Sequence, residues 1–574
     1  MFGSLEWSSS EDRILFIAER YRPKAASYFD KNDKSSESSS YVRGAEHLFF
    51  EEWGELLTKH HCPVPVIFSL ETKDCQAVDC DLSVGQALWG PHDDSLIFIG
   101  WDNEPRRLGL IFCSNRKSAV YLYNLQDLKL EELSGADLSV TSPRLNSDKT
   151  KLVYLGNIVG GPHKSCMRLM MLDLGTRETV TLVDIVNSPG EGGFPGLYVD
   201  ALPSRCWSSD DSKIIFSSIW QSKQEILCVD ISSASVFKIS PDGVAGCWSV
   251  LDVFDDLVTC SFASPSSPSR LMIGLLGEPQ AGSSIQIEGM TTIASSYGNF
   301  ENDLSWEIIK LKPSVGDSRI FYEAVLIRPV QTDDVKPPLI VTPHGGPHSC
   351  AVADFSVSTT TLCLLGFAVL LVNYRGSIGF GQDSIDALLG NIGKIDVCDV
   401  QDAAVNVIQS GVVDPTRILV HGGSHGGFLS CHLIGQFPEF YKAACVRNPV
   451  TNIAAMVGVS DIPDWCHTEV GLLYNVWTTV STADTLTKMI NVSPIRYADK
   501  VKTPILFLVG AQDLRVPPPQ SHEMHYALKA RHVRTKMLVY DKSSHPLMEV
   551  DVEADAFVNM VLWFYDHLSS VKKI

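Results

Sequence analysis

The sequence predicts two domains: an all-β amino-terminal half and a carboxyl-terminal α/β half built on a mostly parallel sheet. Up to about residue 300, short β-rich runs are separated by Ser, Gly, Asp and Pro, without a long helical period. Beyond that point, apolar strand-like runs alternate with helix-like segments. Because 574 residues exceed what one core can hold, we place the domain boundary between residues 302 and 303.

A degenerate repeat runs through the first half. In each copy a Trp or Leu and a short polar stretch precede a strand-like run, and the copies begin at Trp7, Trp89, Leu145, Trp207 and Trp248. The irregular spacing fits four-stranded units with loop insertions, which predicts a β-propeller of about five blade-like repeats, with the Trp or Leu packed between blades. An irregular β-sandwich is the alternative. The Ser-rich residues 31–40 are expected to form a mobile loop.

The second half contains six candidate buried strands and the helices between them. The strands are expected at residues 339–342, 368–373, 418–421, 443–446, 505–509 and 537–540. Residues 397–408 have a helical period, and a helix over 553–568 closes the chain after Asp551 as its N-cap. Apolar strands that alternate with helices predict a parallel sheet covered on both faces.

Composition limits the classes of partner. A net charge of −20 disfavours binding to nucleic acid or to an anionic membrane, and we expect neither partner. No apolar run is long enough to span a bilayer, and the first residues resemble no secretion signal, which favours a cytoplasmic location. The fifteen cysteines show no metal-ligand spacing and are interpreted as reduced core thiols. We predict no metal and no cofactor.

The chemistry centres on the Gly-x-Ser-x-Gly pattern at residues 422–426. An apolar, β-branched run leads into it and a helix-compatible segment follows, which predicts a strand, a sharp turn and a helix. At such a turn Ser424 would adopt a strained conformation, while Gly422 and Gly426 would avoid clashes. A glycine-rich turn without chemistry is the alternative for this pattern taken alone.

Two further strand ends supply partners for Ser424. Asp513 follows the strand at 505–509, and His545 follows the strand at 537–540. A serine hydroxyl needs a base, and that base needs a third group to fix its tautomer. The order Ser, Asp, His at successive strand ends therefore predicts a catalytic triad, although Asp513 alone could be a turn residue and His545 alone a surface histidine.

An oxyanion in the reaction would need two N–H donors. We expect one to be the backbone N–H of His425, which follows the nucleophile. The other should come from the loop His344-Gly345-Gly346-Pro347, with Gly346 the first choice. The loop could equally be described as a tight turn, and the two descriptions are compatible.

Several of these segments together resemble the prolyl oligopeptidase group of serine peptidases, and within it the acylaminoacyl-peptidase family. They are His344-Gly345-Gly346-Pro347, Asn373-Tyr374-Arg375-Gly376-Ser377, Gly422-Gly423-Ser424-His425-Gly426-Gly427, Asp461-Ile462-Pro463-Asp464-Trp465 and Asp513-Leu514-Arg515-Val516-Pro517. The resemblance implies removal of one N-acylated amino acid from short blocked peptides, with a propeller that restricts access. We also expect a homo-oligomer. Family members usually carry seven blades after an amino-terminal segment, so five copies indicate a shortened, incomplete propeller region.

The substrate pocket is expected beside Ser424. The segment with Ile462 and Trp465 follows the strand at 443–446, near the carboxyl edge where ligands of such sheets bind. Trp465 could serve core packing equally well. Since an acylated amino terminus has lost its positive charge, the pocket needs no buried carboxylate.

Two other functions are open. A dipeptidyl or prolyl-type peptidase would grip a free amino terminus with a carboxylate pair, for which Glu51 and Glu52 are the candidates, although such a pair is more often solvated. A propeller scaffold with an inactive hydrolase is the alternative from a different class, and the intact Ser, Asp and His argue against it.

Overall fold

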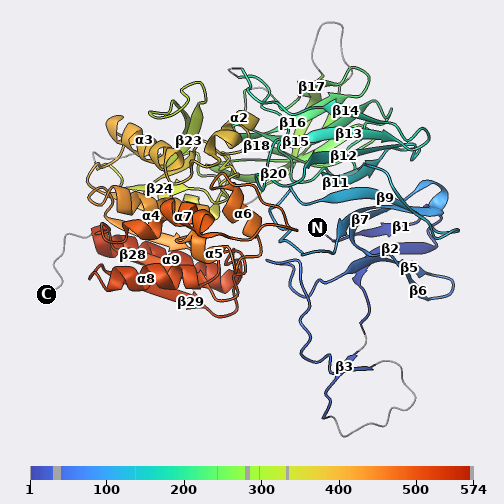
Figure 1. Ribbon diagram of the computed structural model, residues 1–574. Coiled ribbons are helices and arrows are strands. Elements are labelled where there is room, and N and C mark those ends of the chain that lie inside the picture. Colours follow the sequence, from blue (N-terminus) through green and yellow to red (C-terminus); the bar gives the residue numbers. More distant parts are fainter. Residues whose placement is uncertain are drawn as a thin grey trace.

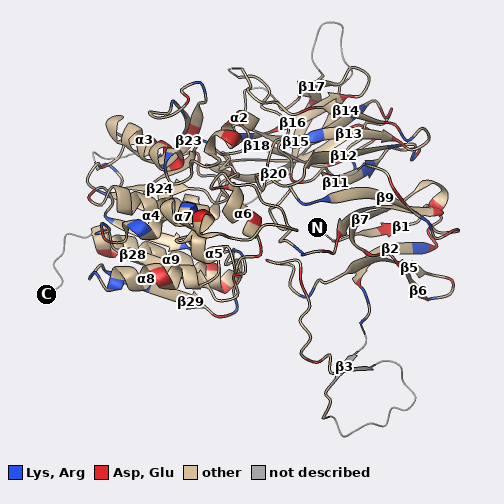
Figure 2. Cartoon of the chain, viewed as in Figure 1, with Lys and Arg blue, Asp and Glu red and all other residues tan. Residues whose placement is uncertain are grey.

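The computed structural model contains the two predicted domains, and it describes residues 2–22, 24–29, 41–135, 137–190, 192–241, 243–277, 285–295, 298–330 and 335–568. Figure 1 shows the all-β domain beside a layered α/β domain. Figure 2 shows acidic and basic residues interspersed over both. The loop expected at residues 31–40 lies outside the described residues. No helix in the described ranges has the length and apolarity that crossing a membrane requires.

The all-β domain is a propeller in which each copy of the repeat lies in or just before the first strands of one blade, so the sandwich alternative is wrong. Blade 1 contains β1 (Leu5–Trp7), β2 (Arg13–Glu19), β5 (Pro63–Ser69) and β6 (Cys75–Ala77). Blade 2 contains β7 (Leu82–Trp89), β8 (Ser95–Asp102), β9 (Ser118–Asn124) and β10 (Leu130–Glu132). Blade 3 contains β11 (Leu138–Leu145), β12 (Lys151–Ile158), β13 (Arg168–Asp173) and β14 (Thr179–Val183).

The last two blades continue this pattern. Blade 4 contains β15 (Lys213–Trp220), β16 (Lys223–Asp230) and β17 (Ser235–Lys238), preceded by an isolated bridge between Trp207 and Ile214. Blade 5 contains β18 (Cys247–Phe254), β19 (Leu257–Ser264), β20 (Ser267–Leu276) and β21 (Ile287–Ser295). A separate short pair joins β3 (Lys24–Ala26) to β4 (Tyr41–Arg43). Blades neighbouring in sequence pack on one another and form the arc visible in Figure 1.

The repeated tryptophans show why the motif recurs. The indole N–H of Trp89 donates to the Glu6 carbonyl of blade 1, and that of Trp207 donates to the Arg144 carbonyl of blade 3. Each ring thus links its blade to the preceding one, as predicted. Trp7 is the exception, with 57% of its surface exposed, because no sheet precedes β1 in the described residues.

The α/β domain is built on one eight-stranded sheet. Its order is β22 (Leu304–Leu311), β23 (Tyr322–Pro329), β25 (Ala368–Asn373), β24 (Leu339–Pro343), β26 (Ile418–Gly423), β27 (Ala443–Arg447), β28 (Ile505–Gly510) and β29 (Thr535–Tyr540). The pairs from β25 to β29 are parallel, and β22 and β23 add an antiparallel edge. All six predicted strands are present. We propose the domain boundary at 302–303, because β21 ends at Ser295 and β22 begins at Leu304.

Helices cover both faces of this sheet. One face packs against α1 (Val357–Leu364) and α9 (Val550–Leu568), and the other against α3 (Ile395–Gln409), α4 (His425–Gln436) and α8 (Pro519–Lys529). Shorter helices at the strand ends are α2 (Gln382–Leu388), α5 (Ile453–Met456), α6 (Pro463–Thr468) and α7 (Ala483–Asn491), with the 3₁₀ turn η2 (Pro494–Tyr497). The other 3₁₀ turn, η1 (Pro91–Asp93), lies between β7 and β8 of the propeller. Asp551 lies in the first turn of α9 rather than at its N-cap, so that detail was wrong. All fifteen cysteines are free and most are buried, as expected.

Candidate active site

Ser424 lies in the turn between β26 and α4. Its backbone has φ 58° and ψ −122°, a left-handed conformation that is costly for a residue with a side chain. A Cβ on Gly422 would lie 2.3 Å from the Gly426 carbonyl oxygen, and one on Gly426 would lie 2.3 Å from that of Pro343. The chain can therefore make this sharp turn only with glycine at both positions. The turn holds Ser424 at the carboxyl edge of the sheet.

Asp513 and His545 meet at the ends of neighbouring strands. His545 Nδ1 lies 2.6 Å from Asp513 Oδ2, and the other carboxylate oxygen accepts the N–H groups of Arg515 and Val516 at 2.9 and 2.8 Å. Asp513 is buried, with 3% of its surface exposed. A proton on Nδ1 that is held by this carboxylate leaves Nε2 free to accept another. Ser424 and His545 line the same cavity, so the imidazole and the hydroxyl group border a common space.

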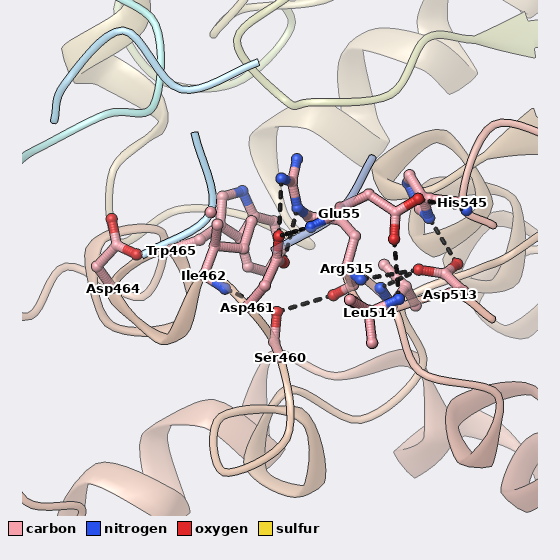
Figure 3. Close-up of polar contacts among 12 residues, drawn as sticks. Glu55, Ser460, Asp461, Ile462, Asp464, Trp465, Asp513, Leu514, Arg515 and His545 are labelled. Carbon is pink, nitrogen blue, oxygen red and sulfur yellow. Dashed lines mark hydrogen bonds and ion pairs between the residues drawn. The ribbon is translucent and has the colours of Figure 1, made fainter. Parts of the chain in front are cut away.

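A carboxylate from the propeller half supports both loops, and sequence reasoning missed it. Glu55 is 1% exposed; its Oε1 accepts the N–H of His545 at 2.8 Å and its Oε2 accepts that of Leu514 at 2.9 Å. Figure 3 shows Glu55 between the Asp513 and His545 loops. These partners lie 490 and 459 residues away along the chain. No local pattern marks such a contact, although Glu55 lies only three residues after Glu52.

Substitution of Glu55 by Gln is expected to lower kcat/KM by about 10- to 100-fold while the chain stays folded. One of the two backbone N–H groups would lose a charged acceptor, and such a hydrogen bond is worth about 1.5–3 kcal/mol. Steady-state kinetics test this, with Glu51→Gln as the matched control, because the Glu51 carboxylate bonds the N–H of Arg107 and touches neither loop. Equal kinetics for Glu55→Gln and Glu51→Gln would contradict the supporting role.

The two predicted oxyanion donors come from segments next to Ser424. His425 is the first residue of α4, where a backbone N–H has no intrahelical acceptor. The loop with Gly345 and Gly346 approaches from β24; a Cβ on Gly345 would lie 3.3 Å from the Ser424 Cβ atom. Gly346 has φ +122°, and its carbonyl accepts the Trp465 indole N–H at 3.0 Å. This bond fixes the loop through the very residue expected to line the pocket.

The His425 side chain has a structural setting of its own. Its Nε2 lies 3.1 Å from Asp396 Oδ2, its ring stacks on Phe428 at 4.7 Å, and it is fully buried. The imidazole therefore lies in the core behind the turn. Only the backbone N–H of His425 remains available to a reacting carbonyl.

Burial lowers the pKa of three histidines around this turn, His344, His421 and His432, to about 4. The unfolded chain takes up protons on these groups below pH of about 6.5, whereas the folded chain does so only near pH 4. The contribution of these three histidines to the free energy of unfolding is therefore fully present above about pH 6.5. It is lost as the pH falls toward 4, by about 4 kcal/mol per pH unit for the three together. Urea unfolding between pH 7 and 5 tests this. His432→Gln should reduce the slope by about a third, and an unchanged stability at pH 5 would contradict the assignment.

Ser424 and His545 line a cavity of about 300 Å³. Ile462 and Trp465 both line it and are 5% and 4% exposed, so Trp465 belongs to the core and the pocket wall at once. The described residues that line the cavity include no Asp or Glu, but they include the cationic residues Lys164, Arg447 and Arg515. The cavity therefore suits an uncharged group or an anion better than an ammonium ion.

The segment from Asp461 to Trp465 also joins the two domains through buried ion pairs. Asp461 pairs with Arg515 at 2.9 and 3.0 Å and accepts the Glu55 N–H at 2.9 Å, and Asp464 pairs with Arg116 of the propeller at 2.5 Å. Burial alone would raise the pKa of Asp461, but the Arg515 guanidinium holds it below its usual value. Figure 3 shows Asp461 and Asp464 on either side of the pocket residues. The sequence segment was recognised, but its role at the interface was not.

Glu51 and Glu52 are not among the residues that line the cavity with Ser424. The Glu51 carboxylate accepts the Arg107 N–H at 3.1 Å, and Glu52 lies 3.9 Å from the His61 ring. The structure therefore does not bring this carboxylate pair to the candidate active site.

The α/β sheet with its sharp serine turn, joined to a β-propeller, defines the class of propeller-bearing serine peptidases. Residues 1–295 match the family model of the acylamino-acid-releasing enzyme N-terminal domain, and residues 353–571 match that of the prolyl oligopeptidase family. The chain belongs to the acylamino-acid-releasing enzymes of the prolyl oligopeptidase family and is a serine peptidase.

Relatives and solved structures agree with this placement. The acylamino-acid-releasing enzymes of Mus musculus and Arabidopsis thaliana are 41% and 32% identical, over 99% and 98% of this chain and 80% and 79% of their own lengths. The Pyrococcus horikoshii acylaminoacyl peptidase has a TM-score of 0.74 at 16% identity, covering 100% of this chain and 82% of its own. A puromycin-hydrolyzing peptidase of Mycobacterium tuberculosis has a TM-score of 0.69 at 16% identity, with coverages of 99% and 79%. These structures are similar in fold.

Proposed function

We propose that this chain releases a single N-acylated amino acid from the blocked end of short peptides, with Ser424 as nucleophile, His545 as base and Asp513 as its orienting partner. The observation that carries the proposal is the cavity that Ser424 and His545 share, which has cationic residues but no carboxylate among the described residues of its wall. An acylated amino terminus is neutral and can enter such a space, whereas a free ammonium would lose its hydration without gaining a counter-charge.

The proposed reaction follows from these positions. Ser424 Oγ attacks the carbonyl carbon of the acylated residue while His545 Nε2 takes the hydroxyl proton. The N–H groups of His425 and Gly346 stabilise the oxyanion. His545 then gives its proton to the leaving amine, and the peptide departs with a new amino terminus. Water, activated by the same histidine, breaks the acyl-enzyme ester and releases the acylated amino acid.

The pocket residues contribute by shape and position. Ile462 and Trp465 give the cavity apolar walls, and the indole N–H of Trp465 holds the Gly346 carbonyl. We propose that the acyl group and the first side chain contact these walls. The propeller half contributes Glu55, so the reaction depends on both domains in contact.

The partners and location complete the proposal. We propose short N-acylated peptides as substrates, a cytoplasmic location and a homo-oligomer, with no nucleic-acid or membrane partner. The net charge of −20 supports the absence of polyanionic partners. The dipeptidyl-type alternative loses its support, because Glu51 and Glu52 lie away from the cavity wall.

Product analysis tests the reaction. An N-acetylated tripeptide and its unblocked form are incubated with the chain, and the products are identified by mass spectrometry. We expect acetylated first residue and free dipeptide from the blocked peptide alone. Release of a dipeptide from the unblocked form at a similar rate would contradict the proposal and favour the dipeptidyl-type function. No hydrolysis of either peptide would favour the scaffold.

A further inference from the structure

Three side chains far apart in the sequence converge beside the active-site cavity. His163 lies between β12 and β13 of the propeller, His348 follows the Gly345-Gly346-Pro347 loop, and Glu469 directly follows α6. One ligand atom of each lies within 4.8 Å of the others, and within the described ranges no other trio of His, Cys, Asp or Glu has this property. Both histidines also line the cavity that contains Ser424.

The polar atoms of this cluster lack hydrogen-bond partners. His163 is 8% exposed, and His348 and Glu469 are fully buried. His163 Nδ1, His348 Nε2 and both carboxylate oxygens of Glu469 have no hydrogen bond in the described structure. A buried carboxylate is costly unless a positive charge lies beside it, and either a protonated His348 or a bound cation can supply that charge.

The distances within this cluster also leave room for a cation between the ligands. His348 Nδ1 lies 2.8 Å from the Gly376 carbonyl oxygen, so this nitrogen carries a proton, and in the neutral ring Nε2 presents a lone pair toward Glu469. Nε2 lies 3.2 Å from Glu469 Oε1, yet the two atoms are not aligned for a hydrogen bond. His163 Nδ1 lies 3.9 Å from the same oxygen. Ligands placed tetrahedrally around Zn²⁺ are about 3.3 Å apart, so small side-chain movements would enclose an ion.

We propose that His163, His348 and Glu469 form a binding site for a Zn²⁺-class cation. Two imidazoles and one carboxylate are a ligand set that zinc accepts, and the fourth position would face the cavity. The ion would tie the propeller, through His163, to the hydrolase loop that carries Gly346. It would also add bulk to the cavity wall, so its binding is expected to stabilise the contact between domains and to weaken substrate binding.

The test uses the full Ser424→Ala chain, so that its outcome is independent of catalysis. Isothermal titration with Zn²⁺ should show one site with a Kd of about 1 μM or below. His163→Gln and Glu469→Gln should each weaken this affinity by about 100-fold or more. His532 is exposed, so His532→Gln serves as the matched control and should bind Zn²⁺ with the affinity of the parent. Far-UV circular dichroism and Tm establish whether each variant is folded. If Glu469→Gln does not fold, the affinity of His163→Gln alone tests the proposal.

Co²⁺ replaces zinc in a second measurement that identifies the ligands. The cavity also contains the Cys113 thiol, which could bind zinc by itself. The proposed site predicts visible d–d bands without a thiolate charge-transfer band, and unchanged binding in Cys113→Ser. Absence of a binding site, parent-like affinity in His163→Gln, or a thiolate band with loss of binding in Cys113→Ser would each overturn the proposal.

Discussion

The Ser424→Ala chain is expected to fold as the parent does and to lose at least about 10⁵-fold in kcat. Removal of the hydroxyl removes the acyl-enzyme route, whereas alanine faces the same left-handed backbone conformation as serine. The loss can be measured with a chromogenic acetyl-amino-acid substrate, and the fold by Tm. An organophosphonate probe should label the parent at Ser424 and leave the variant unlabelled.

Ser410→Ala is the matched control for this experiment. Ser410 lies at the end of α3, donates its hydroxyl to the Val407 carbonyl and does not line the cavity. Its variant should retain activity and labelling. Activity in Ser424→Ala, or a probe adduct mapped to another serine, would show that the nucleophile lies elsewhere.

Asp513→Asn should lower kcat by about 10⁴-fold. The carboxylate accepts the His545 Nδ1 proton at 2.6 Å, whereas an amide nitrogen at that position would favour the tautomer protonated on Nε2. That tautomer has no lone pair facing Ser424. The variant should keep the loop fold, because the other oxygen can still accept the N–H groups of Arg515 and Val516.

The control for this variant is Asp541→Asn. Asp541 is exposed at the end of β29, near His545 in sequence, and its carboxylate does not hold the imidazole. Steady-state kinetics on both variants separate the effect of the orienting carboxylate from a general loss of negative charge. Similar activities in the two variants would mean that another group orients His545.

Local patterns were enough to predict much of this structure. The six strands were predicted because buried parallel strands are continuous apolar runs, and the sharp turn at Ser424 was predicted because it demands glycine on both sides. Asp513 and His545 followed from their places at strand ends. The five blades were found because a similar phrase recurs near the start of each one, and at Trp89 and Trp207 its indole N–H links the blade to the preceding one.

Contacts between domains could not be predicted in this way. Glu55 acts on loops more than 450 residues away, and the Arg116–Asp464 pair and the His163 cluster each join two domains. No periodicity or spacing in one sequence records which loop of a propeller faces which strand end. Trp7 was misjudged for a related reason, because its exposure depends on whether a sheet precedes it.

The central claim is that the cavity beside Ser424 accepts an uncharged, acylated amino terminus. Desolvation of a free amine without a counter-charge costs several kcal/mol, and each 1.4 kcal/mol is a factor of about ten. The measurement is kcat/KM for matched acetyl-alanyl and alanyl substrates with the same leaving group. We expect the acetylated substrate to be preferred by about 100-fold or more; equal values for the two substrates would contradict the claim.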